Sequence, residues 1–259
     1  MEKSKILTWE EYRKLPYKDT WFFTLNKSNQ WLYFLGVSHS NNPSDPQHKF
    51  IKEKWDEFIK STDGLPRLAF QEGGLRELAS NEEEAIIKNS EPGLVVYIAH
   101  KSNVEVISPE LKNQEELDLL TKEFERDAVA YYYFARTVDQ WLRQKSNTPL
   151  EFYIKGMFGR SNQYKGWEDF DMSLENMKKL HKKFLGKDFD EKDRMTFNNA
   201  VNPAKEGTII NGVSRALQRA RDEYILEQID KHWSEGKNLF IVYGSSHAMR
   251  LEPAIKDQL

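Results

Sequence analysis

Two short apolar runs near opposite ends of the chain limit its fold more than any other feature. The first, "WLYFLGV", covers residues 31–37, and the second, "NLFIVYG", covers residues 238–244. A short run that is apolar at successive positions is typical of a strand with both faces buried, and such strands belong to parallel sheets covered by helices on both sides. We therefore predict an α/β fold with a mainly parallel β-sheet core flanked by helices.

The residues after the first run complete a strand–helix–strand unit. A polar loop comes first, and a helix is then predicted with Ser44 or Asp45 as its N-cap and Pro46 in its first turn. A second short strand is expected through residues 68–70, with Glu72 where that strand ends. Because crossovers between parallel strands are nearly always right-handed, we expect a right-handed connection here.

The remaining sequence predicts more elements of the same kinds. Residues 104–107 and 150–155 suit strands, residues 115–145 and about 208–233 suit helices, and a short helix is expected after Pro253. The polar residues 156–207 interrupt this alternation, so we interpret them as a mostly helical or irregular insertion, or a lid. Residues 1–259 are expected to form a single domain around that insertion.

Composition restricts the classes of partner and chemistry. The chain has no cysteine, which removes thiolate nucleophiles and Cys-ligated metals. Its 38 basic and 41 acidic residues leave a net charge of −3, so nucleic acid is not an expected partner. We expect neither a secretory signal nor a membrane-spanning helix, because the first residues lack an uninterrupted apolar stretch and no later segment approaches about 20 apolar residues. We expect a cytoplasmic protein that acts on a small molecule or a peptide away from membranes; its oligomeric state stays open.

Both apolar runs lead into the same spacing, a glycine followed three positions later by a histidine. The motifs are "GVSH", which ends at His39, and "GSSH", which ends at His247. In open α/β sheets ligands bind outside the carboxyl ends of the strands, where Glu72 is also expected. We therefore predict that His39, Glu72 and His247 face one site. Glu110, which follows the strand expected at 104–107, is a further candidate.

Two imidazoles and a carboxylate support two kinds of chemistry. As metal ligands, His39, Glu72 and His247 suit a divalent ion such as Mn, Zn, Fe or Co, which would lower the pKa of a bound water and supply hydroxide. Without a metal, the same groups can act as a general base oriented by a carboxylate. The residues alone leave both mechanisms open.

The motifs "GVSH", "QEGG" and "GSSH" resemble those of the TraB/Tiki, erythromycin-esterase and ChaN-like superfamily. The resemblance rests on residues 31–76 and 208–255. It implies a hydrolase acting on an ester or amide bond, with His39, Glu72 and His247 as catalytic residues or metal ligands. Members of this group include metal-dependent proteases, metal-independent esterases and a haem binder, so a protein that binds haem or another small ligand without catalysis is the alternative.

The resemblance also implies an arginine at the site. The segment "RARDEYILEQI" is similar to the helix that precedes the last strand in this group, and Arg221 is the best match. A guanidinium there could pair with Glu72 or stabilise a developing oxyanion. Arg215 and Arg219 lie nearby in the sequence and could serve equally well, and Arg76 is a weaker candidate.

Overall fold

The chain forms two compact units. The computed structural model describes residues 5–16, 18–144, 147–158 and 163–259. Unit 1 comprises Met1–Glu110 and Arg221–Leu259, and unit 2 comprises Leu111–Ala220. This division differs from the single domain expected from the sequence, and unit 2 extends well beyond the insertion expected at 156–207. The reason is that the helices before and after that segment pack with it into one core.

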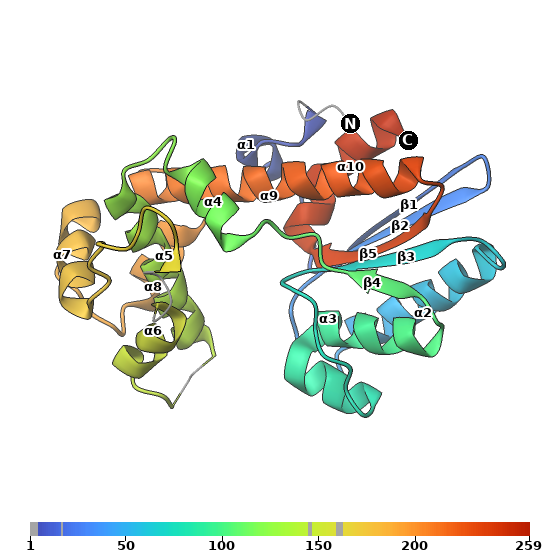
Figure 1. Ribbon diagram of the computed structural model, residues 1–259, viewed down its shortest axis with the longest axis horizontal. Helices are drawn as coiled ribbons and strands as arrows, with labels where there is room; N and C mark the ends of the chain where they lie inside the picture. Colours follow the sequence, from blue (N-terminus) through green and yellow to red (C-terminus); the bar gives the residue numbers. More distant parts are fainter. Residues whose placement is uncertain (1–4, 17, 145–146, 159–162) are drawn as a thin grey trace. The chain divides into compact units, whose positions relative to one another are not determined.

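Unit 1 is built on a five-stranded sheet, which confirms the predicted α/β class (Figure 1). Its strands are β1 (Trp21–Lys27), β2 (Gln30–Val37), β3 (Arg67–Gln71), β4 (Glu105–Ile107) and β5 (Asn238–Gly244). Their order across the sheet is β1-β2-β5-β3-β4. The first pair is antiparallel and the other three pairs are parallel, so the sheet is mainly parallel.

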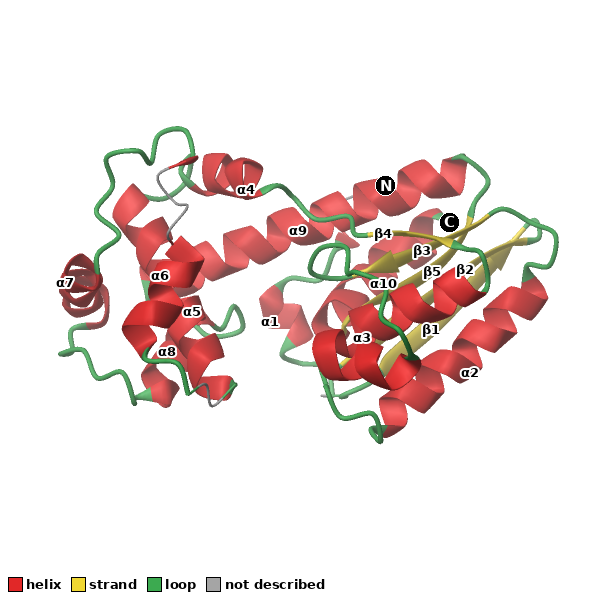
Figure 2. Cartoon of the chain, turned by 60° about the horizontal axis from the view of Figure 1, so that its bottom comes forward, coloured by secondary structure: helices red, strands yellow, loops and turns green. Residues whose placement is uncertain are grey.

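Helices cover both faces of this sheet, as Figures 1 and 2 show. Unit 1 contains α1 (Trp9–Tyr12), α2 (Pro46–Ser61), α3 (Glu82–Lys101), α10 (Ser245–Gln258) and the second part of α9 (Ile209–Ser234). Tyr33 and Leu35 point to the face packed by α2 and α3, whereas Phe34 and Tyr243 point to the face packed by α9 and α10. Alternate residues of the apolar runs are therefore buried on opposite faces.

Strand β1 was not predicted from the sequence. It forms a hairpin with β2, in which Lys27 pairs with Gln30. The two residues between them, Ser28 and Asn29, both have positive φ values, 52° and 65°. This is the conformation that a two-residue turn needs to match the twist of its strands. "SN" is a weaker turn signal than "NG", which explains why the hairpin escapes notice.

The C-terminal helix of unit 1 starts earlier in the sequence than predicted. The terminal helix starts at Ser245, directly after β5, and Pro253 lies inside it. Its buried residues Ala248, Leu251 and Ile255 recur at helical spacing and pack on the sheet. The N-cap predicted for α2 is confirmed, because the Asp45 side chain accepts a hydrogen bond from the backbone N–H of Gln47.

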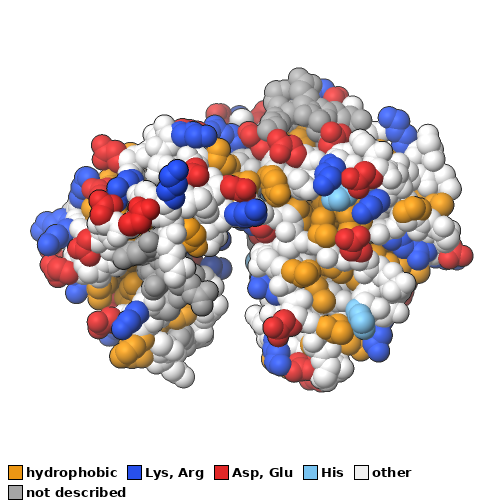
Figure 3. Space-filling view, viewed as in Figure 1, with side chains coloured by type: hydrophobic (Ala, Val, Ile, Leu, Met, Phe, Trp, Pro, Cys, Tyr) orange, Lys and Arg blue, Asp and Glu red, His pale blue; other side chains and the backbone are white. Residues whose placement is uncertain are grey.

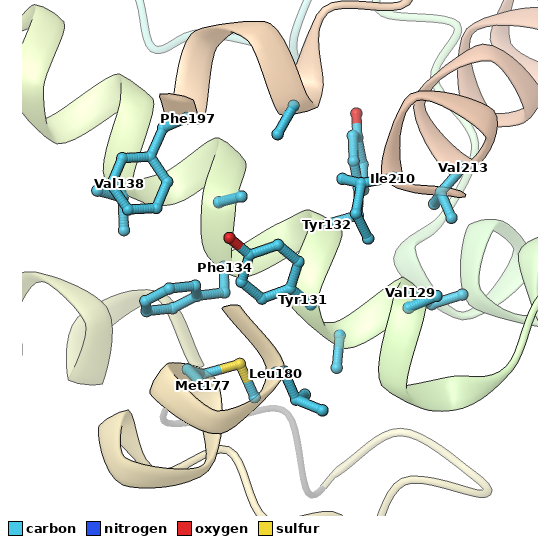
Figure 4. Packing of buried hydrophobic residues seen from close by; sticks show 14 of the residues in the cluster. Val129, Tyr131, Tyr132, Phe134, Val138, Met177, Leu180, Phe197, Ile210 and Val213 are labelled. Carbon is cyan, nitrogen blue, oxygen red and sulfur yellow. The ribbon is translucent and has the colours of Figure 1, made fainter. Parts of the chain in front are cut away.

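Unit 2 is helical, and its buried core is seen in Figure 4. Its helices are α4 (Asn113–Leu120), α5 (Arg126–Arg143), α6 (Leu150–Phe158), α7 (Leu174–Leu185), α8 (Arg194–Val201) and the first part of α9. The strand predicted at 150–155 is wrong: Leu150 and Ile154, four positions apart, are both buried, as expected on a helix. The long helix predicted at 115–145 is divided by a turn between Leu120 and Arg126.

The surface carries charges of both signs. In the face drawn in Figure 3, basic and acidic side chains are interspersed, in keeping with the net charge of −3. Across the described ranges, none of the helices is long and apolar enough to cross a membrane.

Candidate active site

The strand order brings the two histidine motifs together. Because β5 lies between β2 and β3, the last residues of all three strands are neighbours at one edge of the sheet. Val37 pairs with Gly244, and Gln71 pairs with Val242. The residues that follow these positions are therefore directed into one region, which is the place where α/β sheets bind ligands.

The motif glycines allow close approach at this edge. Neither Gly36 nor Gly244 has a left-handed backbone conformation. A Cβ atom on Gly36 would lie 2.7 Å from the Cβ of Ala248, so a side chain there would push α10 away from β2. A Cβ atom on Gly244 would lie 3.4 Å from Glu72 Oε2. Gly36 is thus required by space, and not by an unusual φ angle, whereas the distance at Gly244 is an ordinary van der Waals contact.

Glu72 lies at the centre of the site. Its Oε2 accepts a hydrogen bond from the backbone N–H of Gly244 at 2.7 Å, and its Oε1 accepts one from Arg221 Nη2 at 3.0 Å. The Nε2 atoms of His39 and His247 lie 3.7 Å from Oε2 and from Oε1, respectively. The structure therefore brings the four predicted site residues together around one carboxylate.

Each histidine also contacts a second carboxylate through its other nitrogen. His39 Nδ1 lies 3.3 Å from Oε2 of Glu91, and His247 Nδ1 is hydrogen-bonded to Oδ1 of Asp222. Both of these carboxylates are fully buried. The two imidazoles thus share one arrangement, in which Nδ1 contacts a buried carboxylate and Nε2 lies 3.7 Å from an oxygen of Glu72.

The buried carboxylates have further partners within unit 1. Asp222 forms an ion pair with Arg250, whose Nε donates to the backbone carbonyl of Leu7 at 2.8 Å. Glu91 lies beside His48, with 3.4 Å between Oε1 and Nε2. His48 is itself buried, so a polar layer extends beneath His39 on the α2 and α3 side of the sheet.

Arg221 is the arginine of α9 that reaches the site. Besides Glu72, it contacts Glu110 through Nε at 3.1 Å and through Nη2 at 3.2 Å. This places Glu110, the further candidate, in the same cluster. Of the other arginines considered, Arg215 donates to the Lys205 carbonyl and Arg219 pairs with Glu123.

Arg76 lies beside Gly73, where an added Cβ would stand 2.9 Å from its Nη2. In the part of the chain that the structure describes, Arg76 forms no ion pair with Glu72, whose charged partners are His39, Arg221 and His247.

The charges around Glu72 decide its protonation state. Burial by itself would raise the pKa of this carboxyl, but His247, Arg221 and His39, together with the Gly244 N–H, hold the pKa well below its usual 4.5. The carboxylates of Glu72 and Glu110 in turn raise the pKa of Arg221 against the effect of burial. Glu72 is therefore a carboxylate at neutral pH and serves as an acceptor and negative charge, not as an acid.

The lowered pKa of Glu72 predicts a pH-dependent contribution to stability. A carboxyl whose folded-state pKa is below its unfolded-state pKa stabilises the fold above about pH 4.5, and this contribution is lost as the pH falls towards the folded-state value. Glu72→Gln removes it. We expect the difference in the free energy of unfolding between parent and variant to shrink between pH 6 and about pH 3.

Urea denaturation at a series of pH values measures this difference. Glu77→Gln, at an exposed position of the loop after β3, is the matched control. A parent–variant difference that stays constant from pH 6 to about pH 3 would contradict the role assigned to the Glu72 charge.

The predicted metal ligands have suitable donor chemistry, since imidazole nitrogen and carboxylate oxygen bind divalent transition ions. Within the part of the chain that the structure describes, no three His, Asp or Glu side chains are gathered so that they could hold a metal ion. Each oxygen of Glu72 already accepts a hydrogen bond, Oε1 from Arg221 and Oε2 from the Gly244 N–H.

Two residues of the site were missed in the sequence. Asp222 directly follows Arg221 and reads as one more charge on an amphipathic helix. Glu91 lies in "SEPG", whose Pro and Gly indicate a helix break but say nothing about a buried carboxylate. A charged residue at a helix break between apolar segments is the one signal that could have drawn attention to it.

No protein-family model, curated protein or solved structure matches the chain.

Proposed function

We propose that unit 1 hydrolyses an ester or amide bond with histidine as the general base. The observation that supports this most directly is the matched arrangement of His39 and His247. Each ring has Nδ1 on a buried carboxylate and Nε2 at 3.7 Å from an oxygen of Glu72. Such an arrangement of carboxylate and imidazole is the one that orients a catalytic base.

The carboxylates determine which nitrogen can act as the base. A carboxylate only accepts hydrogen bonds, and Glu91 and Asp222 lie within hydrogen-bonding distance of Nδ1, whereas the Glu72 oxygens lie 3.7 Å from Nε2. The proton is therefore favoured on Nδ1 of both histidines. Nε2 of a neutral ring then carries the lone pair on the side of Glu72. When that nitrogen takes a proton, the negative charge of Glu72 stabilises the imidazolium.

The proposed reaction uses one water molecule. His39 Nε2 takes a proton from the water while the water oxygen forms a bond to the carbonyl carbon of the substrate. The bond from that carbon to the alkoxy oxygen or amide nitrogen then breaks, and the proton passes from His39 to the leaving group. His39 has this role because its side chain is 54% exposed, against 6% for His247.

The other residues support this base. Arg221 is shared between Glu72 and Glu110, so we assign it the positioning of Glu72 and not the stabilisation of an oxyanion. His247 holds the opposite oxygen of Glu72.

A metal-assisted hydrolase is the second candidate. The observation that favours it is again the pair of buried carboxylates, because histidines that ligate metals commonly donate their other N–H to a carboxylate. His39, Glu72 and His247 would have to move closer together than in this structure to hold the ion, and the chemistry that it would supply is a water of lowered pKa.

A single set of measurements on the purified full chain tests the proposal. Hydrolysis of p-nitrophenyl esters of increasing acyl length and of amino-acid p-nitroanilides is followed before and after EDTA treatment, together with elemental analysis for Mn, Zn, Fe and Co. We expect turnover of at least one probe that survives chelation.

Two other results would change the proposed function. If EDTA removes a stoichiometric metal and abolishes turnover, and if adding that metal back restores turnover, the assignment moves to the metal-assisted candidate. Absence of turnover with every probe, combined with a Soret band on haem addition that His39→Ala abolishes, would replace hydrolysis by haem binding.

A further inference from the structure

Helix α3 is broken directly before Glu91. Asn89 and Ser90 leave the helical conformation, and Ser90 has φ 51° and ψ −140°. A residue with a side chain rarely adopts this conformation, and such strain is found mainly where the surrounding structure imposes it for a function. Pro92 and Gly93 follow, and a Cβ atom on Gly93 would lie 2.3 Å from the Ala85 carbonyl oxygen. The break thus depends on several residues in succession.

The break directs Glu91 into the interior, towards the segment that carries His39. Oε1 of Glu91 accepts hydrogen bonds from the backbone N–H of Ser40 at 2.8 Å and from Gln47 Nε2 at 2.9 Å. Oε2 lies 3.3 Å from His39 Nδ1. One carboxylate therefore holds both the ring of His39 and the backbone of the next residue.

A purely structural role does not account for a charge at this position. Burying a carboxylate is unfavourable unless every lone pair finds a donor, and an apolar residue would fill the same space at less cost. The contacts of Oε1 with the Ser40 N–H, with Gln47 and, at 3.4 Å, with His48 Nε2 need only a neutral acceptor, which glutamine could supply. The contact of Oε2 with His39 is the one that depends on a carboxylate, because it decides which ring nitrogen carries the proton.

We propose that Glu91 is the positioning residue for His39, and that the break in α3 at Asn89 and Ser90 exists to place it there. This inference rests on the proposed function, in which His39 is the base. Glu91 keeps the neutral ring of His39 in the Nδ1–H tautomer with Nε2 unprotonated. It also holds the loop after β2 against α2 and α3.

Glu91→Gln tests this assignment because it should reverse the tautomer. If the amide oxygen keeps the contacts with Ser40 and Gln47, the amide NH₂ faces His39 and donates to Nδ1, so that the proton of the ring moves to Nε2. The opposite orientation of the amide would set its NH₂ against the Ser40 N–H, donor against donor.

Long-range ¹H–¹⁵N NMR of the full chain at pH 8.5 distinguishes the two tautomers by their nitrogen shifts. The signals of His39 are identified by their loss in His39→Ala. We expect the Nδ1–H form in the parent and the Nε2–H form in Glu91→Gln. Glu83→Gln, which makes the same change at an exposed position of α3, should leave the parent spectrum unchanged.

Values of kcat and KM distinguish a role of Glu91 in positioning His39 from a role in binding the substrate. Glu91→Gln should lower kcat by at least about 10-fold while KM stays within about twofold, since the substrate does not contact Glu91. Ser90→Gly relieves the strained backbone and keeps Glu91, so it should raise the melting temperature and retain both the parent tautomer and kcat.

The outcomes distinguish this inference from the proposed function. An Nε2–H tautomer in the parent overturns the role of Glu91, and this measurement does not depend on the folding of Glu91→Gln. An unchanged tautomer or an unchanged kcat in folded Glu91→Gln also overturns it. If the parent hydrolyses none of the probes while the tautomer reverses as expected, hydrolysis fails and Glu91 remains the group that sets the state of His39.

Discussion

Replacement of His39 by alanine is expected to lower the hydrolytic kcat by between about 100-fold and about 10,000-fold, the range that general acid–base groups contribute, and replacement of His247, which supports Glu72, by at least about 10-fold. His39→Ala removes the base itself. His247→Ala removes the imidazole that faces Glu72 Oε1 at 3.7 Å. The measurement is kcat for the best probe substrate, with the melting temperature of each variant recorded beside it.

The two variants should differ in stability. His39 is half-exposed, so His39→Ala should melt close to the parent temperature. His247 is buried and bonded to Asp222, so His247→Ala leaves a cavity and one unpaired carboxylate oxygen and should melt several degrees lower.

His100→Ala, at an exposed position of α3, is the matched control and should keep parent activity. If folded His39→Ala or folded His247→Ala keeps more than half of the parent kcat, the two histidines do not share a catalytic site.

The largest expected effect on stability comes from Arg221→Leu. Arg221 is buried and pairs with Glu72 and Glu110, so its removal leaves two carboxylates close together without a cation. Breaking a buried pair in this way typically lowers the free energy of unfolding by about 3 kcal/mol. Urea denaturation at pH 7 measures the loss. Arg221→Lys should recover part of it, because lysine restores the charge without the bidentate geometry.

Arg219→Leu is the control for this prediction. Arg219 lies on the same helix and pairs with Glu123 at the surface, where an ion pair contributes about 1 kcal/mol or less. If Arg221→Leu and Arg219→Leu lower the free energy of unfolding equally, the burial of Arg221 does not make its ion pairs more important for stability than a surface pair. Equal losses would also remove the reason for assigning Arg221 to the support of Glu72.

Much of the α/β core could be read from residue patterns because burial on both faces imposes a local signature. Leu32, Phe34 and Ile241 belong to uninterrupted apolar runs that suit only buried strands. Segments with weaker local signatures were misread. Leu150 and Ile154 looked like part of a strand until their common burial in unit 2 identified a helix, and β1 depended on the turn at Ser28 and Asn29.

The residues of the candidate site could likewise be predicted only in part from the sequence. His39, Glu72 and His247 could be placed at one sheet edge from the sequence, because carboxyl ends of parallel strands share an edge whatever their order. Glu91 and Asp222 could not. They lie 52 and 25 positions from the histidines that they contact, and each approaches its partner from a helix packed on the sheet.

Local patterns thus specify which residues stand at the ends of strands, since uninterrupted apolar runs and turn residues act over a few neighbours. The position of β5 between β2 and β3, the break in α3 and the burial of two carboxylates were decided only by tertiary packing. Helices α2, α3, α9 and α10 had to be placed on the sheet before any of these contacts existed. For that reason the motifs indicated where chemistry could occur, while the protonation and orientation of the histidines depend on the folded structure.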